Sequence, residues 1–331
     1  MNTRDIRAVL LCVAGMAIVG SSVSISQLIL DYPPLTGQTL RYALAAVVLL
    51  AIARWFPQFG GTGQPGTGGR PTRREWGILT ALAATGLAAF NACILVALPH
   101  ADPAVVGTVI GAAPLGLALI GPLLRGGRPT VRLVVAAGIV VAGTAGVHGS
   151  GRADPIGLLA SLGAFGGEIA FSLLAAAVLP RLGAVRVAAY SCALAVPLLL
   201  LSAVAVGEPT RWRLPTAVEG ATLGYLAGLM TVVAFLAWFT GLRHLGVERA
   251  GILVGLMPVA TLVTAAIQAG RLPDPGQSLG VLVVASGLAI GLTARSTATP
   301  TDTPTAPAHP AHPAHPVDHE VIAAQTGQTR Q

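Results

Sequence analysis

Charged side chains are scarce in this sequence, and lysine is absent altogether. Asp, Glu and Arg together make up 10% of the 331 residues, whereas a soluble domain carries about a quarter charged residues. Hydrophobic residues make up 53% of the chain. This composition excludes an ordinary soluble domain and indicates a chain that lies mainly in lipid.

Cysteine is also rare, and its placement argues against two kinds of site. The three cysteines, Cys12, Cys93 and Cys192, each lie inside an apolar segment. An odd number of cysteines in such positions favours neither a disulfide framework nor a metal cage. We therefore predict no metal site and no cofactor.

The sequence offers little that indicates catalysis. It has no His-Glu-x-x-His pair. His100, His148 and His244 lie at the ends of apolar segments, with no evident nucleophile near them in sequence. We predict that the protein is not an enzyme; a membrane enzyme and a non-transporting receptor remain the alternatives from other classes.

Apolar segments of about 20 residues run through the sequence, and each is long enough to cross about 30 Å of hydrocarbon as a helix. The first, with Arg4 and Arg7 ahead of it, is too long for a cleavable signal sequence and is followed at once by another span. We therefore predict an all-α membrane protein with ten transmembrane helices. The predicted spans are 6–30, 35–56, 75–98, 103–124, 131–148, 155–178, 185–206, 217–242, 249–268 and 277–294.

One motif occurs twice and divides these spans into two sets of five. Gly-x-x-x-Gly-x-x-Pro begins at Gly107 and, 144 residues later, at Gly251, so that it ends at Pro114 and at Pro258. A repeat with an odd number of spans must insert upside down relative to its twin. We predict two inverted repeats whose matched helices are bent by the two prolines. The predicted domains are 1–150 for the first repeat, 151–295 for the second repeat and 296–331 for a tail.

Arginine alone predicts the orientation, because basic residues gather in the short cytoplasmic loops of membrane proteins. With the N-terminus inside, the inner segments hold fifteen arginines. The outer loops hold only Arg152, Arg211, Arg213 and Arg271. This bias predicts a cell-membrane protein with both termini in the cytoplasm, and it explains the net charge of +7 without a nucleic-acid partner.

Two stretches outside the spans are predicted to be unfolded. Residues 58–72 are dominated by Gly, Thr and Pro, which indicates a flexible cytoplasmic connection. In the tail at 296–331, His309, His312 and His315 would line one edge of a polyproline helix and hold a transition metal weakly. We favour a solvated, disordered cytoplasmic tail without a metal.

Polar residues inside the spans indicate function, because an ionisable side chain at the membrane centre costs about 3 kcal/mol unless it faces protein or water. Glu168 lies at the centre of the sixth span, and Gly157, Ser161 and Ser172 share its helix face. We predict that Glu168 binds either a proton or a cationic or amine-bearing solute.

Arg41 lies about two turns into the second span from the outer side. Its long side chain can extend to the outer headgroups or pair with Asp31. Alternatively, it can bind the carboxylate of a substrate through a bidentate contact. The sequence leaves both interpretations open.

Further polar or aromatic residues of the spans complete the predicted substrate site: Ser24, Gln27, Asn91, Ser172, Tyr225, Trp238 and Thr261. Such residues line the cavities of many transporters. The alternative is that the hydroxyl groups bond to their own helix or to a neighbouring one, as they commonly do in membrane bundles.

Ten spans in two sets of five, Arg41 followed by Tyr42 in the second span, and the repeated Gly-x-x-x-Gly-x-x-Pro segment resemble the EamA branch of the drug/metabolite transporter superfamily. The resemblance covers residues 1 to about 295. It implies that spans one to four and six to nine surround a central cavity, with spans five and ten as outer support. It also implies a secondary transporter that exports amino acids, other small metabolites or drugs by alternating access, with a small-molecule substrate and the lipid bilayer as partners.

The same resemblance bears on proton coupling. Small multidrug exporters of the superfamily use a membrane carboxylate in the first helix of their unit, and Glu168 lies in the first helix of the second repeat. The first helix of the first repeat has no carboxylate near its centre, which departs from a symmetric pair. Two mechanisms therefore stay open: coupling to protons through Glu168, and uncoupled facilitated transport.

Overall fold

The computed structural model describes residues 3–29, 31–55, 70–124, 126–148, 152–270 and 272–292. The predicted connection at 58–72, apart from its last three residues, and the predicted tail at 296–331 lie outside the described residues. The described helices all belong to one packed unit, Met1–Ala294.

Six of the predicted spans are single helices in the described part of the chain. They are α1 (Thr3–Ser26), α2 (Pro34–Trp55), α8 (Val131–His148), α9 (Pro155–Leu182), α10 (Ala184–Ala205) and α15 (Pro275–Leu292). Short 3-10 helices follow α1 and α10, namely η1 (Gln27–Ile29) and η3 (Glu208–Arg211).

The other four spans are interrupted. The third consists of α4 (Arg73–Ala81), the π-helix η2 (Leu82–Ala89) and α5 (Phe90–Ala97). The eighth consists of α11 (Ala217–Tyr225), the π-helix η4 (Leu226–Val233) and α12 (Ala234–Leu245). The fourth is divided into α6 (Pro103–Gly111) and α7 (Ala113–Leu124), and the ninth into α13 (Val247–Leu253) and α14 (Leu256–Ala269). The two π-helices lie 144 residues apart, at the spacing of the repeated motif.

Within the described residues, nine helical stretches are long and apolar enough to cross a membrane, and Val131–Val147 is a shorter apolar helix at the place of the fifth span. The prediction of an all-α membrane protein is therefore confirmed, and the helix ends lie close to those expected. One difference has a clear cause. The sixth span continues to Leu182 instead of ending at residue 178, because Gly183, with φ of 77°, is the residue that terminates the helix.

Local sequence signals explain where several helices begin. Thr72 and Glu75 form a capping box at the start of α4, and Thr216 and Glu219, at the same 144-residue spacing, form a second one at the start of α11. In each box the threonine hydroxyl accepts a backbone N–H of the first turn, and the glutamate accepts the backbone N–H of the threonine. The third span of each repeat therefore begins with the same capping motif.

The prolines of the repeated motif follow breaks in the helices rather than lying inside continuous ones. Pro114 lies in the first turn of α7, and Pro258 lies in the first turn of α14. Proline has no N–H and disfavours helical backbone in the residue before it, so it is accommodated most easily where a helix begins. Each predicted bend is thus a junction between two half-helices.

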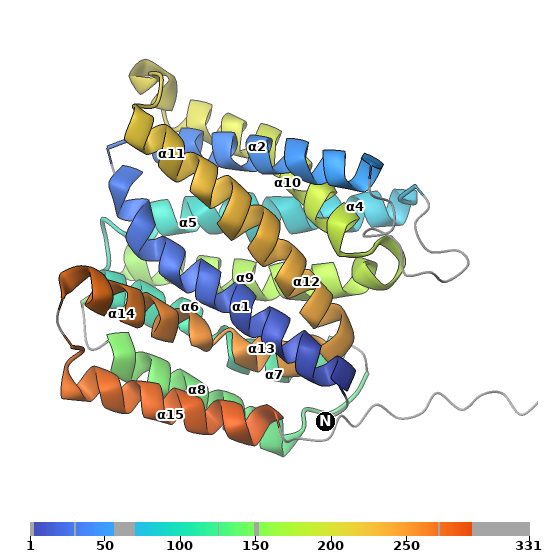
Figure 1. The fold of residues 1–331 in the computed structure, drawn as a ribbon, viewed down its shortest axis with the longest axis vertical. Helices are drawn as coiled ribbons and strands as arrows, with labels where there is room; N and C mark the ends of the chain where they lie inside the picture. Colours follow the sequence, from blue (N-terminus) through green and yellow to red (C-terminus); the bar gives the residue numbers. More distant parts are fainter. Residues whose placement is uncertain are drawn as a thin grey trace, which may run out of the picture. The chain divides into compact units, whose positions relative to one another are not determined.

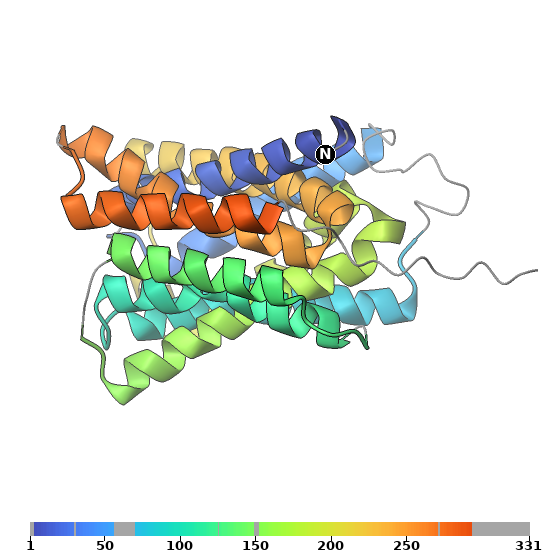
Figure 2. The same ribbon diagram turned by 90° about the horizontal axis from the view of Figure 1, so that it is seen from below.

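Eight spans form a closed ring in which each packs against two neighbours. Around the ring, α2 contacts α10, α10 contacts η2, α5 contacts α9, α9 contacts α6, α7 contacts α13, α14 contacts α1, α1 contacts α12, and η4 contacts α2. Spans five and ten, α8 and α15, pack against each other outside this ring, beside α6, α7 and α14. Figures 1 and 2 show this outer pair at the edge away from α2 and α10. The arrangement agrees with the one that the resemblance implies.

Counterpart helices of the two halves run antiparallel. Glu208, just after α10, accepts hydrogen bonds from the backbone N–H groups of Leu35 (2.9 Å) and Thr36 (2.7 Å) at the start of α2. In the α8–α15 pair, a Cβ on Gly143 near the end of α8 would lie 2.8 Å from the carbonyl oxygen of Gly280 near the start of α15. Only small residues allow so close an approach. Antiparallel pairing of counterparts is what two inverted copies require.

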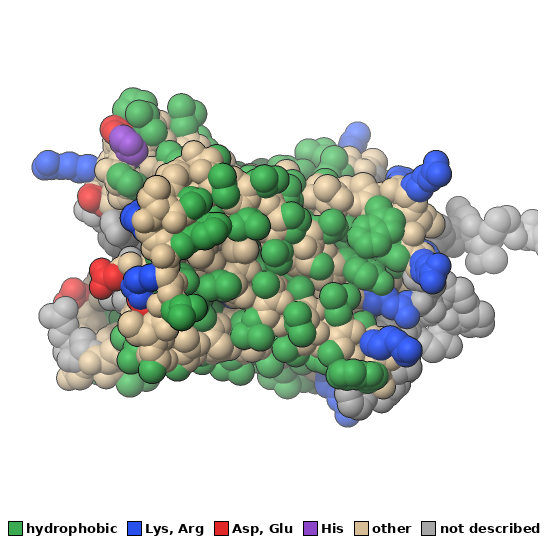
Figure 3. Space-filling view, turned by 90° about the horizontal axis from the view of Figure 1, so that it is seen from above, with side chains coloured by type: hydrophobic (Ala, Val, Ile, Leu, Met, Phe, Trp, Pro, Cys, Tyr) green, Lys and Arg blue, Asp and Glu red, His purple; other side chains and the backbone are tan. Residues whose placement is uncertain are grey.

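The surface of the helical unit is apolar in the middle and charged at its ends. In the view of Figure 3, hydrophobic side chains cover the middle, carboxylates and a histidine lie at one end, and arginines lie at both ends. An apolar band between two polar ends is the surface that a bilayer requires.

Candidate functional site

Arg41 lies inside the ring rather than among lipid headgroups. It is 5% exposed, and its Nε donates a hydrogen bond to Oγ1 of Thr231 on η4 (2.7 Å). Its Nη1 donates to Oε1 of Gln38 (2.9 Å), and its Nη2 lies 3.4 Å from the hydroxyl of Tyr42. Asp31 is exposed, and it forms no ion pair with Arg41 in the described part of the chain. In this structure Arg41 therefore neither extends to the lipid headgroups nor forms an ion pair with Asp31.

Thr231 owes its position to the π-helix. It is fully buried, and its hydroxyl donates to the carbonyl oxygen of Leu226, five residues earlier, at 2.9 Å. In an ordinary α-helix a threonine hydroxyl donates to the carbonyl oxygen three or four residues earlier. Thr240 on α12 does so, to the carbonyl oxygen of Leu236. Because its proton is given to Leu226, the oxygen of Thr231 is free to accept from Arg41. π-Helical turns are rare and often occur at functional sites.

Tyr42 joins Arg41 to the third and sixth spans. The guanidinium carbon of Arg41 lies 4.7 Å from the centre of the Tyr42 ring, within the range of a cation–π contact. The Tyr42 hydroxyl also lies within interaction range of the side chains of Asn91 on α5 and Glu168 on α9. The structure thus brings Arg41, Asn91 and Glu168, three of the predicted site residues, together with Tyr42 and Thr231. We call these five residues the interior polar cluster.

Glu168 and Ser172 have unused hydrogen-bonding capacity. The carboxyl of Glu168 is partly buried and makes no hydrogen bond or ion pair with the residues that the structure describes. One turn further along α9, Ser172 is fully buried, and its hydroxyl has no partner there either. Ser161 of the same face bonds back to Gly157 (2.7 Å). Because buried polar groups are normally hydrogen-bonded, Glu168 and Ser172 are suited to bind a solute, a proton or water.

Arg41 of the first half, and Glu168 and Thr231 of the second half, have no polar counterpart in the opposite half. The places that match them at the 148-residue and 144-residue spacings are apolar: Gly20 for Glu168, Ala189 for Arg41 and Leu87 for Thr231. The two halves therefore share their helix geometry, including the π-helices, but not their polar chemistry. The interior polar cluster is asymmetric within a nearly symmetric bundle.

Three of the predicted residues lie outside the contacts of this cluster. Thr261 on α14 donates to the carbonyl oxygen of Gly20 on α1 (2.9 Å), so its hydroxyl joins two helices, as the packing alternative expects. Trp238 is buried in the apolar core, and Tyr225 is half-buried at the end of α11. The side chains of the predicted residues Ser24 and Gln27 lie outside the described part of the structure.

Aromatic side chains cross the ring between the cluster and the C-terminal end of α9. Phe171 of α9 lies 5.3 Å, between ring centres, from both Phe235 and Phe239 of α12, although α9 and α12 are not neighbours in the ring. At the same end, Arg181 of α9 forms a two-pronged ion pair with Glu75 of α4. These contacts hold the sixth, third and eighth spans together at that end.

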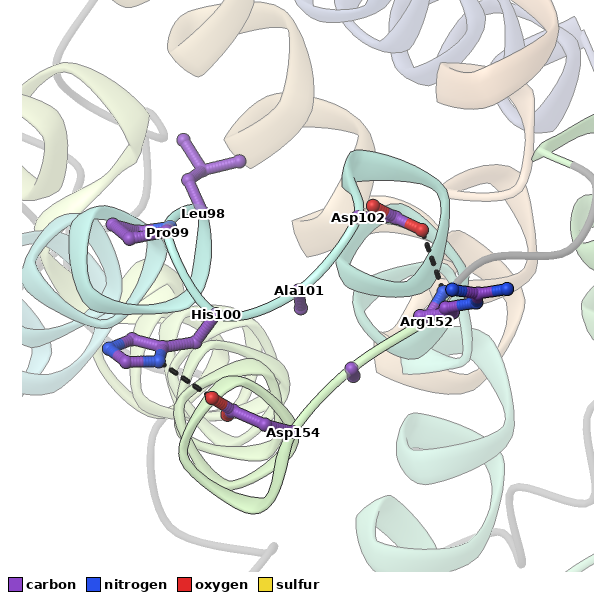
Figure 4. Close-up of a pocket in the computed structure, with 8 residues that line it drawn as sticks. Leu98, Pro99, His100, Ala101, Asp102, Arg152 and Asp154 are labelled. Carbon is purple, nitrogen blue, oxygen red and sulfur yellow. Dashed lines mark hydrogen bonds and ion pairs between the residues drawn. The ribbon is translucent and has the colours of Figure 1, made fainter.

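A small open pocket of about 250 Å³ lies at the other end, between residues 98–102 and 152–154. Figure 4 shows the ring of His100 facing Asp154, with 2.8 Å between Nδ1 and the carboxylate, and Asp102 accepting the backbone N–H of Arg152. The Gly157 backbone N–H and the His100 side chain hold the pKa of Asp154 below its usual value. The pocket residues belong to loops that an antiparallel bridge between Ala101 and Ala153 holds together, and none of them belongs to the interior polar cluster.

Comparison with known proteins agrees with this architecture. A protein of known crystal structure superimposes on 86% of this chain and on 95% of its own length, with a TM-score of 0.69 at 22% sequence identity, and so has the same fold. Two proteins of Bacillus subtilis (strain 168) are similar in sequence. The uncharacterized transporter YetK is 23% identical over 266 residues, 77% of each chain. The uncharacterized transporter YdeK is 28% identical over 261 residues, 76% of this chain and 85% of its own.

The family comparison covers both halves of the helical unit. The EamA-like transporter family matches residues 6–148 and again residues 155–293. The chain is therefore a multi-pass membrane transporter, with a small-molecule substrate and the bilayer as its surroundings. It belongs to the EamA-like transporter family.

Proposed function

We propose that the protein is a secondary transporter that exports small carboxylate-bearing solutes, such as amino acids or other small metabolites, by alternating access. The observation that carries the proposal is the state of Arg41. Its guanidinium is almost fully buried, and no carboxylate of the described residues pairs with it. A buried charge without a counter-ion is costly. A solute carboxylate would supply that counter-ion and would therefore bind favourably to Arg41.

Glu168 supplies the second half of the proposal. A carboxyl without a protein partner near mid-membrane favours either a bound proton or a cationic group. We propose that Glu168 alternates between a proton and the amino group of the solute, which couples export to proton entry. An uncoupled facilitator of small solutes is the alternative mechanism.

Movement is proposed to occur at the junctions of the interrupted spans. When the cluster opens toward the cytoplasm, Phe171 would have to separate from Phe235, and Glu75 from Arg181. The half-helix junctions before Pro114 and Pro258 occur in both halves of the bundle, and they offer hinges at matched places.

A flux assay tests this function. Purified protein in liposomes is given labelled L-leucine, L-threonine or benzoate, and the matching amides L-leucinamide, L-threoninamide and benzamide. We expect at least one acid to be transported more than about tenfold faster than its amide, because an amide replaces one acceptor of the bidentate contact by a donor. If every acid crosses no faster than in protein-free liposomes, the protein is not a carboxylate transporter.

We also propose that the chain lies in the cell membrane with both termini in the cytoplasm. The test uses a variant in which Cys12, Cys93 and Cys192 are alanine. A single cysteine at Leu214, which is 90% exposed in a predicted outer loop, should react with an impermeant thiol reagent added to intact cells. A single cysteine at the exposed Gly127 in a predicted inner loop should react only after the cells are opened. The opposite pattern would reverse the orientation.

A further inference from the structure

The guanidinium of Arg41 is held on all three of its nitrogens. Nε donates to Thr231, Nη1 to Gln38, and Nη2 makes a longer contact with the Tyr42 hydroxyl. An arginine has five N–H groups, one on Nε and two on each terminal nitrogen. Three are used, so the two that remain are one on Nη1 and one on Nη2. These are the two nitrogens at the end of the side chain, which together can hold both oxygens of one carboxylate.

Thr231 decides which edge of the guanidinium stays available. Arginine can bind a carboxylate with Nε and Nη2 from the side, or with Nη1 and Nη2 from the end. The bond from Nε to Thr231 occupies the side, and the Tyr42 ring makes a cation–π contact with the guanidinium. Only the end remains for a solute.

We infer that Thr231 is a positioning residue for transport: it fixes Arg41 so that a solute carboxylate binds end-on to Nη1 and Nη2. The inference rests on the proposed function of Arg41 as a carboxylate receptor. Thr231 does not touch the solute in this arrangement, but it sets the direction from which the solute must approach.

The π-helix gives Thr231 this role. Its proton is committed to Leu226 at the five-residue spacing, so that the oxygen facing α2 can only accept. The matching π-helix η2 carries Leu87 at this place, opposite Ala189, and so has no corresponding polar pair. A purely structural demand of the π-helix would be the same in both halves, yet the hydroxyl is present only where an arginine faces it.

The test compares Thr231→Val, which keeps the shape of the side chain and removes the oxygen, with Thr231→Ser, which keeps the oxygen. It uses the acid–amide pair among leucine, threonine and benzoate that the wild-type protein separates best. We expect Thr231→Val to raise KM for the acid about tenfold, because a hydrogen bond to a charged group is lost and the guanidinium can rotate. The kcat for the acid and the KM for the amide should change less than about twofold, and Thr231→Ser should restore the acid KM.

Thr240→Val is the matched control, because Thr240 lies on the same span and bonds only to Leu236 among the described residues. It should leave the acid–amide ratio unchanged. If Thr231→Val gives too little folded protein, Thr231→Ala is measured with the same pair. A wild-type acid preference that Arg41→Gln removes and that Thr231→Val, or Thr231→Ala in its place, keeps would overturn the positioning role alone. A wild-type protein without any acid preference would overturn the proposed function as well.

Discussion

Replacing Arg41 by glutamine should lower kcat/KM for carboxylate solutes by at least about thirtyfold while leaving the protein folded. The loss follows from the contact that is removed: truncating one partner of a buried, hydrogen-bonded charge pair costs about 2–5 kcal/mol, and each 1.4 kcal/mol is about a factor of ten. The amide of the same solute should be affected far less, because it never made the full contact.

Stability should respond differently from transport. Removal of the guanidinium leaves the Thr231 and Gln38 oxygens without their donor, which is unfavourable, but it also removes a buried charge that has no counter-ion in the described structure. We therefore expect a small change in the thermal midpoint. Arg41→Lys is the informative second variant, since it keeps the charge and loses the planar fork.

Arg54→Gln serves as the control, because Arg54 is exposed at the far end of the same helix. It should transport at the wild-type rate. Equal kcat/KM for the acid in Arg41→Gln and in wild type would mean that Arg41 only ties α2 to η4. The solute would then have to bind elsewhere in the ring.

The spans could be predicted from sequence because a bilayer imposes one strong rule, that about 20 residues must be predominantly apolar. Pro114 and Pro258 stood out for a similarly local reason, since a proline removes a backbone hydrogen bond of its helix. The sequence predicted a bend at each, whereas the structure has a break just before each. Arg41 and Glu168 stood out because so few charged residues lie within the spans.

The partners of Arg41 could not be predicted with the same ease. Thr231 is one of several hydroxyl residues in the spans, and nothing in composition distinguishes it from Thr240, which only bonds to its own helix. Its role depends on a π-helix, and a π-helix has no compositional signature of the kind that glycine or proline gives to a turn. Gln38, one turn before Arg41, could have been suggested by helical spacing alone.

Contacts between distant loops were hidden for another reason. Glu208 is fully buried and caps α2 from more than 170 residues away, and His100 pairs with Asp154 across two loops. Such contacts depend on how the two halves pack, which no local pattern encodes. The hydroxyl of Thr261, predicted as a site residue, is instead used to join α14 to α1.

Glu168→Gln should abolish the accumulation that a pH gradient drives, while the protein still inserts and folds. Glutamine keeps the volume of the side chain and resembles the protonated acid, so a residue that must gain and lose a proton in each cycle is held in one state. An antiporter moves solute toward the acidic compartment, and one proton per solute at a gradient of one pH unit supports about tenfold accumulation, since one pH unit corresponds to about 1.36 kcal/mol. The ratio in the variant should fall to about one.

The matched control is Asp274→Asn, which neutralises an exposed carboxylate in a predicted outer loop and should keep the wild-type ratio. Protein-free liposomes with the same gradient correct for amines that are trapped passively in the acidic compartment. Exchange of labelled for unlabelled solute without a gradient should survive in Glu168→Gln, because binding and reorientation need no proton once the charge is gone. Full accumulation by the variant would instead mean that Glu168 is a polar contact between helices and that another group couples transport to protons. A wild-type protein that accumulates no solute under the gradient would be an uncoupled facilitator.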